Sequence, residues 1–202
     1  MKRSAAIAIV VSLGLAGAAA AQTTGMPYFN APYRAFGQHE LGGTISFLDG
    51  GQGFEGMYGF GTGRIDIGVR GGLYDPDGAA NADFIAGVRG RGMFLLHTEE
   101  FPLDGSIIAG IGTRGFDQWI IPGGVSFGRR IDIENSPVSI VPYGQPTLFF
   151  DINPDRVDGD DVEIRFAFGF GADVRVSRVL DLRVGVGLGD IEGVAISAVW
   201  VR

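Results

Sequence analysis

Apolar residues alternate with small or charged residues along most of the chain after residue 38. The clearest run extends from Val162 to Val176, and two further runs cover 64–74 and 180–189. A period of two places alternate side chains on opposite faces of a β-strand, whereas a helix would repeat every 3.6 residues. Each run has about the ~9–11 residues that a tilted strand needs to cross a bilayer. The pattern therefore predicts an all-β chain.

The same alternation, read along the whole chain, predicts ten strands. They are expected near 40–48, 53–61, 64–74, 82–96, 104–114, 119–132, 138–150, 161–176, 179–189 and 193–201. The sixth and seventh are the least regular, because Pro122, Pro142 and Pro146 lack the N–H that a strand ladder uses. If these two strands form one irregular unit, the number falls to eight.

The connections between the strands favour a single closed antiparallel up-and-down barrel. If the chain starts on the periplasmic side, the loops at 49–52, 75–81, 115–118, 151–160 and 190–192 are external, and they are rich in Asp, Gly and Asn. The opposite connections are Thr62-Gly63, 97–103, 133–137 and Ser177-Arg178. Long polar outer loops with short inner turns are typical of transmembrane barrels, although 97–103 is long for an inner turn.

Alternation alone does not say which face of the barrel meets water. The chain has 35 glycines in 202 residues, and many lie on the polar face, where a solvated strand has no reason to prefer them. Phe166, Phe168 and Phe170 on the other face would overfill a small soluble core. The polar face also carries charges of both signs, which can pair across a narrow lumen. This predicted charge network comprises Asp66, Arg70, Arg89, Arg91, Arg114, Glu163, Arg165, Asp173, Arg175, Asp181 and Arg183.

Aromatic residues gather near the predicted strand ends, as they do in the interfacial girdles of membrane barrels. This predicted girdle comprises Phe47, Phe60, Tyr74, Phe84, Phe94, Trp119, Phe127, Tyr143 and Trp200. We therefore expect lipid outside the barrel and a crowded polar lumen within it.

The first 38 residues do not follow the strand pattern. Residues 1–21 have a basic start, a short apolar stretch and a small-residue end at Ala19-Ala20-Ala21, which predicts a cleaved signal peptide. Residues 22–38 contain Pro27 and Pro32 and do not alternate, so they are interpreted as a periplasmic tail or a small plug. The barrel domain is expected at 39–202.

The pattern over residues 40–202 resembles that of the small bacterial outer-membrane β-barrel proteins, the broad OmpA-like class. The last strand, from Val194 to Arg202, is similar to the C-terminal strand that the barrel-assembly machinery recognises in that class. The resemblance implies an assembly signal at Ile196, Ala198 and Trp200. Members of the class usually end on an aromatic residue, whereas two residues follow Trp200 here.

Candidate chemistry is sparse. The chain has no cysteine and two histidines, His39 and His97, and neither joins a pattern of catalytic partners, so we expect no enzymatic activity. Asp151, Asn153 and Asp155 resemble the start of a calcium loop, but Arg156 stands where glycine is required and Val162 where glutamate is, so they are a weak metal candidate. No cofactor is expected. The net charge of −7 argues against nucleic acid as a partner.

These observations predict a non-enzymatic, porin-like protein of the Gram-negative cell outer membrane, with a structural, surface-contact or narrow-pore role. The expected partners are outer-membrane lipid and lipopolysaccharide, together with the barrel-assembly machinery and periplasmic chaperones during biogenesis, and the protein is expected to be a monomer. Two alternatives stay open. One is a soluble periplasmic lipocalin-like barrel that binds an apolar ligand, and the other is a barrel enzyme that hydrolyses lipid or peptide.

Overall fold

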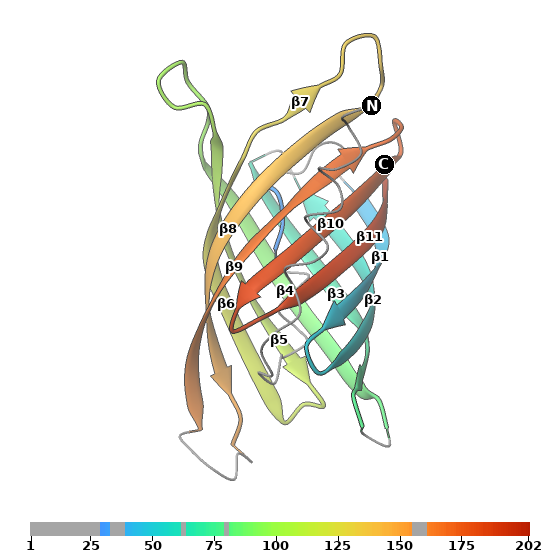
Figure 1. The fold of residues 1–202 in the computed structure, drawn as a ribbon, viewed down its shortest axis with the longest axis vertical. Helices are drawn as coiled ribbons and strands as arrows, with labels where there is room; N and C mark the ends of the chain where they lie inside the picture. Colours follow the sequence, from blue (N-terminus) through green and yellow to red (C-terminus); the bar gives the residue numbers. More distant parts are fainter. Residues whose placement is uncertain (1–28, 33–38, 62–63, 79–80, 155–160) are drawn as a thin grey trace, which may run out of the picture.

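The computed structural model describes residues 29–32, 39–61, 64–78, 81–154 and 161–202. These residues form a closed antiparallel up-and-down barrel of ten long strands, with a two-residue strand, β7, beside them (Figure 1). The strands are β1 (His39–Leu48), β2 (Gly51–Gly61), β3 (Ile65–Pro76), β4 (Asp83–Leu95), β5 (Asp104–Arg114), β6 (Gln118–Gly128), β7 (Ile131–Asp132), β8 (Ser139–Ile152), β9 (Val162–Arg175), β10 (Leu180–Gly189) and β11 (Gly193–Val201). Within these ranges, no helix is long and apolar enough to cross a membrane.

Each long strand pairs with its neighbours in the chain, and the pairing of β1 with β11 joins the first strand to the last. The predicted number of ten is therefore confirmed. The proline-containing strands β6 and β8 are two separate strands that pair with each other, with Pro122 opposite Phe149. Their ladder is interrupted at Val125 and Ser126, opposite Pro146, which has no N–H to contribute. The sheet thus tolerates the prolines by losing pairs locally, and the eight-strand alternative is wrong.

The start of β1 and the end of β11 lie at the same end of the barrel, where the His39 N–H donates to the Arg202 carbonyl at 3.0 Å. We call this the terminal end, and the other the loop end. Connections 62–64 and 176–179 at the terminal end are short, as predicted. The connections that follow β4 and β7 are not, because both project beyond the strands in Figure 1. The connection after β4 was already expected to be long for an inner turn, so only the one after β7 departs from the expected short turns at this end.

The two faces of the barrel differ sharply in polarity. On the outer face, Phe166, Phe168 and Phe170 are exposed by 51%, 41% and 36%. The charged residues of the opposite parity, such as Asp173 and Arg183, are buried inside. A ligand-binding soluble barrel would have the reverse arrangement, so the polarity of the two faces disfavours the apolar-ligand alternative.

The lumen is less uniformly polar than the sequence predicted. Charged side chains cluster along β1, β3, β4, β9 and β10, while β6 and β8 contribute Ile120, Val141 and Phe149 to a buried apolar cluster. Residues 29–32 lie inside the barrel and join that cluster through Phe29 and Ala31. The rest of the predicted tail or plug, 22–28 and 33–38, lies outside the described residues.

Two members of the predicted aromatic girdle point the other way. Tyr74 and Tyr143 are buried in the lumen, 1% and 7% exposed, because they share strand parity with Arg70 and Gln145. The Tyr74 hydroxyl donates to the Gly50 carbonyl at 2.6 Å, next to the β1–β2 turn, where Gly50 has a φ of 94° that favours glycine. Phe47, Phe60, Phe84, Phe94, Trp119 and Trp200 do point outward.

Candidate functional site in the lumen

The largest group of lumen charges surrounds Arg183 on β10. Its Nη2 lies 2.7 Å from Glu40 Oε1 of β1 and 3.9 Å from Asp181 Oδ2, and its Nε lies 3.5 Å from Asp173 Oδ2 of β9. Asp181 also accepts a hydrogen bond from Arg175 Nε at 2.9 Å. The register explains most of these contacts, since Asp173 stands directly opposite Arg183, and Arg175 opposite Asp181.

The contact between Glu40 and Arg183 spans the intervening strand β11. This strand turns Ala195, Ser197 and Val199 toward the lumen, and these short side chains leave room for the longer ones to meet above them. Buried charges are tolerated when they are paired and hydrogen-bonded. The cluster therefore connects β1 with β10, two strands that do not pair directly.

A second group joins β3 and β4. Asp66 stands opposite Arg91 in the register, and Asp66 Oδ2 accepts a hydrogen bond from Arg91 Nε at 2.6 Å. Arg89 Nη2 lies 3.9 Å from Asp66 Oδ1. Arg91 also donates from Nη1 to the carbonyl of Ala31, so this group contacts the segment inside the barrel.

Smaller groups lie nearer the loop end. Arg70 Nη1 is 3.6 Å from Glu55 Oε2 of β2. Arg165 lies 3.3 Å from Asp151 and 2.8 Å from Glu163, which is half exposed at the rim. The pairs Glu55–Arg70 and Asp151–Arg165 each join adjacent strands, whereas Glu163 and Arg165 lie on the same strand, β9.

Arg114, on β5, lies closest to the loop-end rim and is only partly buried. It donates to Asp83 at 2.6 Å and lies over the Tyr74 ring at 4.6 Å. The structure therefore brings the predicted network together as several clusters, with Arg114 and Glu163 at the rim rather than in the lumen centre.

The sequence interpretation omitted Glu40 and Glu55. Both have the parity of the lumen face. Leu41 and Ile45, which directly follow Glu40 and Thr44, point outward. Phe54, which directly precedes Glu55, also points outward. Strict use of the alternation in the first two strands would have found them. Glu55 is 3% exposed at its side chain, and neither of its oxygens has a hydrogen-bond partner among the described residues.

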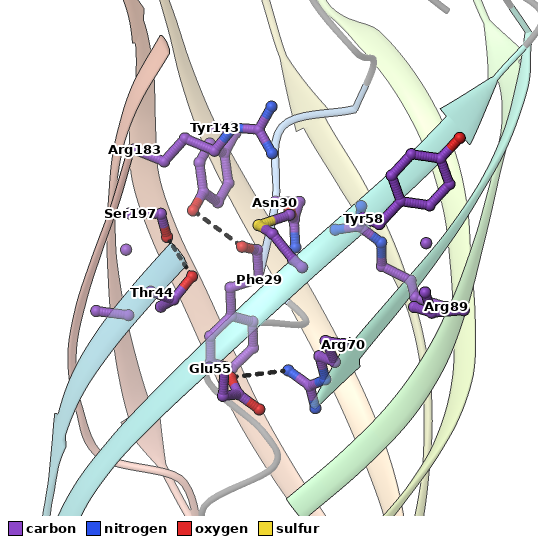
Figure 2. Close-up of a pocket in the computed structure, with 15 residues that line it drawn as sticks. Phe29, Asn30, Thr44, Glu55, Tyr58, Arg70, Arg89, Tyr143, Arg183 and Ser197 are labelled. Carbon is purple, nitrogen blue, oxygen red and sulfur yellow. Dashed lines mark hydrogen bonds and ion pairs between the residues drawn. The ribbon is translucent and has the colours of Figure 1, made fainter. Parts of the chain in front are cut away.

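A cavity of about 40 Å³ lies beside Phe29 and is lined by residues of β1, β2, β3, β4, β8, β10 and β11 (Figure 2). Four charged residues line it, Glu55, Arg70, Arg89 and Arg183. The Thr44 and Ser197 hydroxyls, 2.8 Å apart, also line it. A polar cavity of this size holds a few waters, since one water needs roughly 10–15 Å³. This cavity is therefore large enough for water and too small for a larger solute.

The other predicted candidates have different positions. Asp151 of the weak metal candidate is buried in the lumen, where it accepts a hydrogen bond from Gln118 Nε2 at 2.8 Å and pairs with Arg165. Asp155 lies outside the described residues, and no group that could hold a metal ion is found in the parts of the chain that are described. Ile196 and Trp200 are 51% and 61% exposed on the outer face of β11, and Ala198 lies on the same face.

The histidines lie apart from each other near the terminal end. His39 Nδ1 is 2.7 Å from the Tyr58 hydroxyl, and His97 Nδ1 is 2.9 Å from Asp104 Oδ1. Asp104 also accepts a hydrogen bond from the His97 backbone N–H at 2.9 Å, so this pair closes the connection between β4 and β5. Each interaction holds neighbouring segments of the barrel together, which is a structural role.

No protein family and no curated protein matches the sequence. Among solved structures, the chain is similar to the outer membrane protein Omp33 of Acinetobacter baumannii, with 11% identity and a TM-score of 0.40. That match covers 86% of this chain and 100% of the other.

Proposed function

We propose that this protein is a transmembrane β-barrel of the bacterial outer membrane. The observation that carries the proposal is the inverted polarity of the barrel, with apolar side chains outside and charge pairs inside. Monomeric soluble proteins rarely expose continuous apolar patches above a few hundred Å². Here large apolar side chains are exposed on every long strand of the described barrel, for example Leu41, Ile107 and Ile164 at 64%, 56% and 64%. Lipid is the solvent that suits such a surface.

Strand length supports the same proposal. The strands of the barrel have between 9 residues in β11 and 14 residues in β8 and β9. A strand tilted by about 45° needs ~9–11 residues to cross the hydrocarbon core. Closure also leaves no unpaired sheet edge in the lipid, which is a condition for any β-structure that spans a bilayer.

We further propose that the protein is not an enzyme and has a structural or surface-contact role, with at most a narrow pore. The ion-pair clusters, the apolar cluster and residues 29–32 lie within the lumen, and the cavity beside Phe29 has a volume of about 40 Å³. This supports passage of ions or water and opposes passage of larger solutes.

The proposed orientation places the terminal end in the periplasm, because its connections 62–64 and 176–179 are short, as periplasmic turns are. Acidic residues such as Asp77, Asp117 and Glu192 then line the external rim, where divalent cations would bridge them to lipopolysaccharide phosphates. Assembly by the periplasmic chaperones and the barrel-assembly machinery, with Ile196, Ala198 and Trp200 as the signal, is part of the same proposal, as is a monomeric state. Cleavage of the signal peptide remains a prediction, since residues 1–28 lie outside the described part.

The two tryptophans offer a direct test. They are the only tryptophans in the sequence, and both point outward near opposite ends of the barrel, Trp119 at the start of β6 and Trp200 near the end of β11. In lipid vesicles, lipids brominated along the acyl chain are expected to quench the fluorescence of both, most strongly from positions near the headgroups. The variants Trp119→Phe and Trp200→Phe would separate the two signals.

The same preparation has a second readout. A folded barrel is expected to migrate on a gel at a different apparent mass before and after boiling, and to fractionate with outer membranes. Unquenched tryptophans in a protein that stays soluble without detergent would overturn the membrane proposal.

A further inference from the structure

Residues 29–32 are held inside the barrel by their backbone. Each of their four carbonyls accepts a hydrogen bond from a lumen side chain, and the Asn30 N–H donates to Gln145 Oε1 at 2.9 Å. The donors to the carbonyls of residues 29, 30, 31 and 32 are, in that order, Tyr143 (3.2 Å), Ser126 (2.5 Å), Arg91 and Ser106. Figure 2 shows the bond between Tyr143 and the Phe29 carbonyl.

The lumen side chains that hold this backbone come from β4, β5, β6 and β8. Ser126 and Gln145 lie where the ladder between β6 and β8 is interrupted, and there they bind the two backbone groups of Asn30. A buried carbonyl without a partner is destabilising, so a wall that satisfies four in a row is matched to an extended peptide. Because these bonds reach backbone atoms, they do not depend on the side chains of the segment.

Side-chain selection comes from three closely packed positions, at Phe29, Ala31 and Pro32. The Phe29 ring packs edge-on against Phe149, with ring centroids 6.2 Å apart, and it also covers Gly169, where an added methyl group would fall on the ring. Ala31 is completely buried, 0% exposed, so a larger residue has no space there. Next to it, Gly128 leaves room for the Pro32 ring, since a methyl group there would lie 3.0 Å from Pro32 Cδ.

We propose that the lumen is a binding site for an extended peptide, and that residues 29–32 are its occupant in cis. The ligand class is a peptide that carries an aromatic residue, any residue, a small residue and proline in succession. Peptide binding in the lumen goes beyond the proposed function, because it does not require a membrane and takes place in detergent as well. A segment attached to the barrel has an effective concentration of the order of mM, so it masks the site from weak external peptides.

The test uses the full chain refolded in detergent and a fluorescein-labelled peptide with the sequence Tyr-Phe-Asn-Ala-Pro-Tyr of residues 28–33. Phe29→Ala weakens the occupant in cis, so this variant is expected to bind the peptide at least about tenfold more tightly than the unmodified chain, as measured by fluorescence anisotropy. The same peptide with alanine in place of its phenylalanine is expected to lose at least about tenfold in affinity, because the aromatic anchor is gone.

Two further variants locate the binding. Adding Gly169→Ala to Phe29→Ala is expected to abolish binding of the peptide, because the methyl group blocks the anchor position. Gly123→Ala is the matched control, since this β6 glycine faces outward with nothing within 4 Å of an added methyl group.

If the Gly169 variant does not fold, as judged by heat-modifiable migration, Ser106→Ala and Ser126→Ala remove one backbone bond each and are expected to weaken binding severalfold. Peptide binding that is absent from the Phe29 variant, or indifferent to Gly169 and to both serines, would overturn the proposal.

Discussion

Replacing Arg183 with methionine is expected to lower the free energy of unfolding by about 3–5 kcal/mol, among the largest effects of any single substitution in this barrel. The guanidinium faces Glu40, Asp173 and Asp181, and all these carboxylates are at least nine-tenths buried. Methionine keeps much of the volume but leaves the carboxylates facing one another without the guanidinium. The measurement is urea-induced unfolding in lipid vesicles, followed by tryptophan fluorescence.

Three controls make this prediction specific to the charge cluster. Arg178→Met removes an exposed arginine from the turn between β9 and β10 and is expected to change the unfolding free energy by less than about 0.5 kcal/mol. Arg183→Lys keeps the charge and is expected to recover part of the loss. Adding Glu40→Gln to Arg183→Met is expected to restore stability relative to the single variant, because one repelling carboxylate is removed. An unfolding midpoint identical to that of the unmodified chain would mean that water screens the cluster and that the lumen is an open pore.

The alternation of the sequence predicted the strands well because a closed sheet imposes one rule on every strand. Each strand has one face toward the wall's exterior and one toward the lumen, and a single parity per strand satisfies both. Even the proline-containing β6 and β8 obey it, since the ladder loses pairs locally while keeping its register. Where the prediction failed, as for Tyr74 and Tyr143, position near a strand end was given more weight than parity.

The contents of the lumen were harder to predict. Which charges meet depends on the length of the side chains between them, as Glu40 reaches Arg183 across β11 only because that strand presents short residues. The docking of residues 29–32 left no signal in the sequence, because the acceptors are backbone carbonyls, which every residue has. A period-two pattern therefore predicts the wall of such a barrel, and only the closed structure reveals what fills it.

Replacing Phe168 with arginine is expected to lower the free energy of unfolding in lipid vesicles by about 2–4 kcal/mol, because a guanidinium would face the middle of the hydrocarbon core. Phe168 is central in β9, which spans Val162–Arg175, and its side chain is 41% exposed on the outer face. Its neighbours on that face of the strand, Phe166 and Phe170, are also apolar. The measurement is again urea-induced unfolding in vesicles.

The depth dependence separates this membrane effect from a packing effect. Ile65, 63% exposed at the start of β3, lies near the terminal end, and Ile65→Arg is expected to cost about 0–1 kcal/mol because the interface is hydrated. Phe168→Leu, which removes the ring without adding charge, is expected to cost less than Phe168→Arg. In a soluble barrel an outward-facing arginine would be solvated at either position, so equal and small effects for Phe168→Arg and Ile65→Arg would contradict a lipid-facing surface. A graded loss of stability from rim to centre requires a low-dielectric medium around the strands, which is the physical condition that the outward-facing apolar residues indicate.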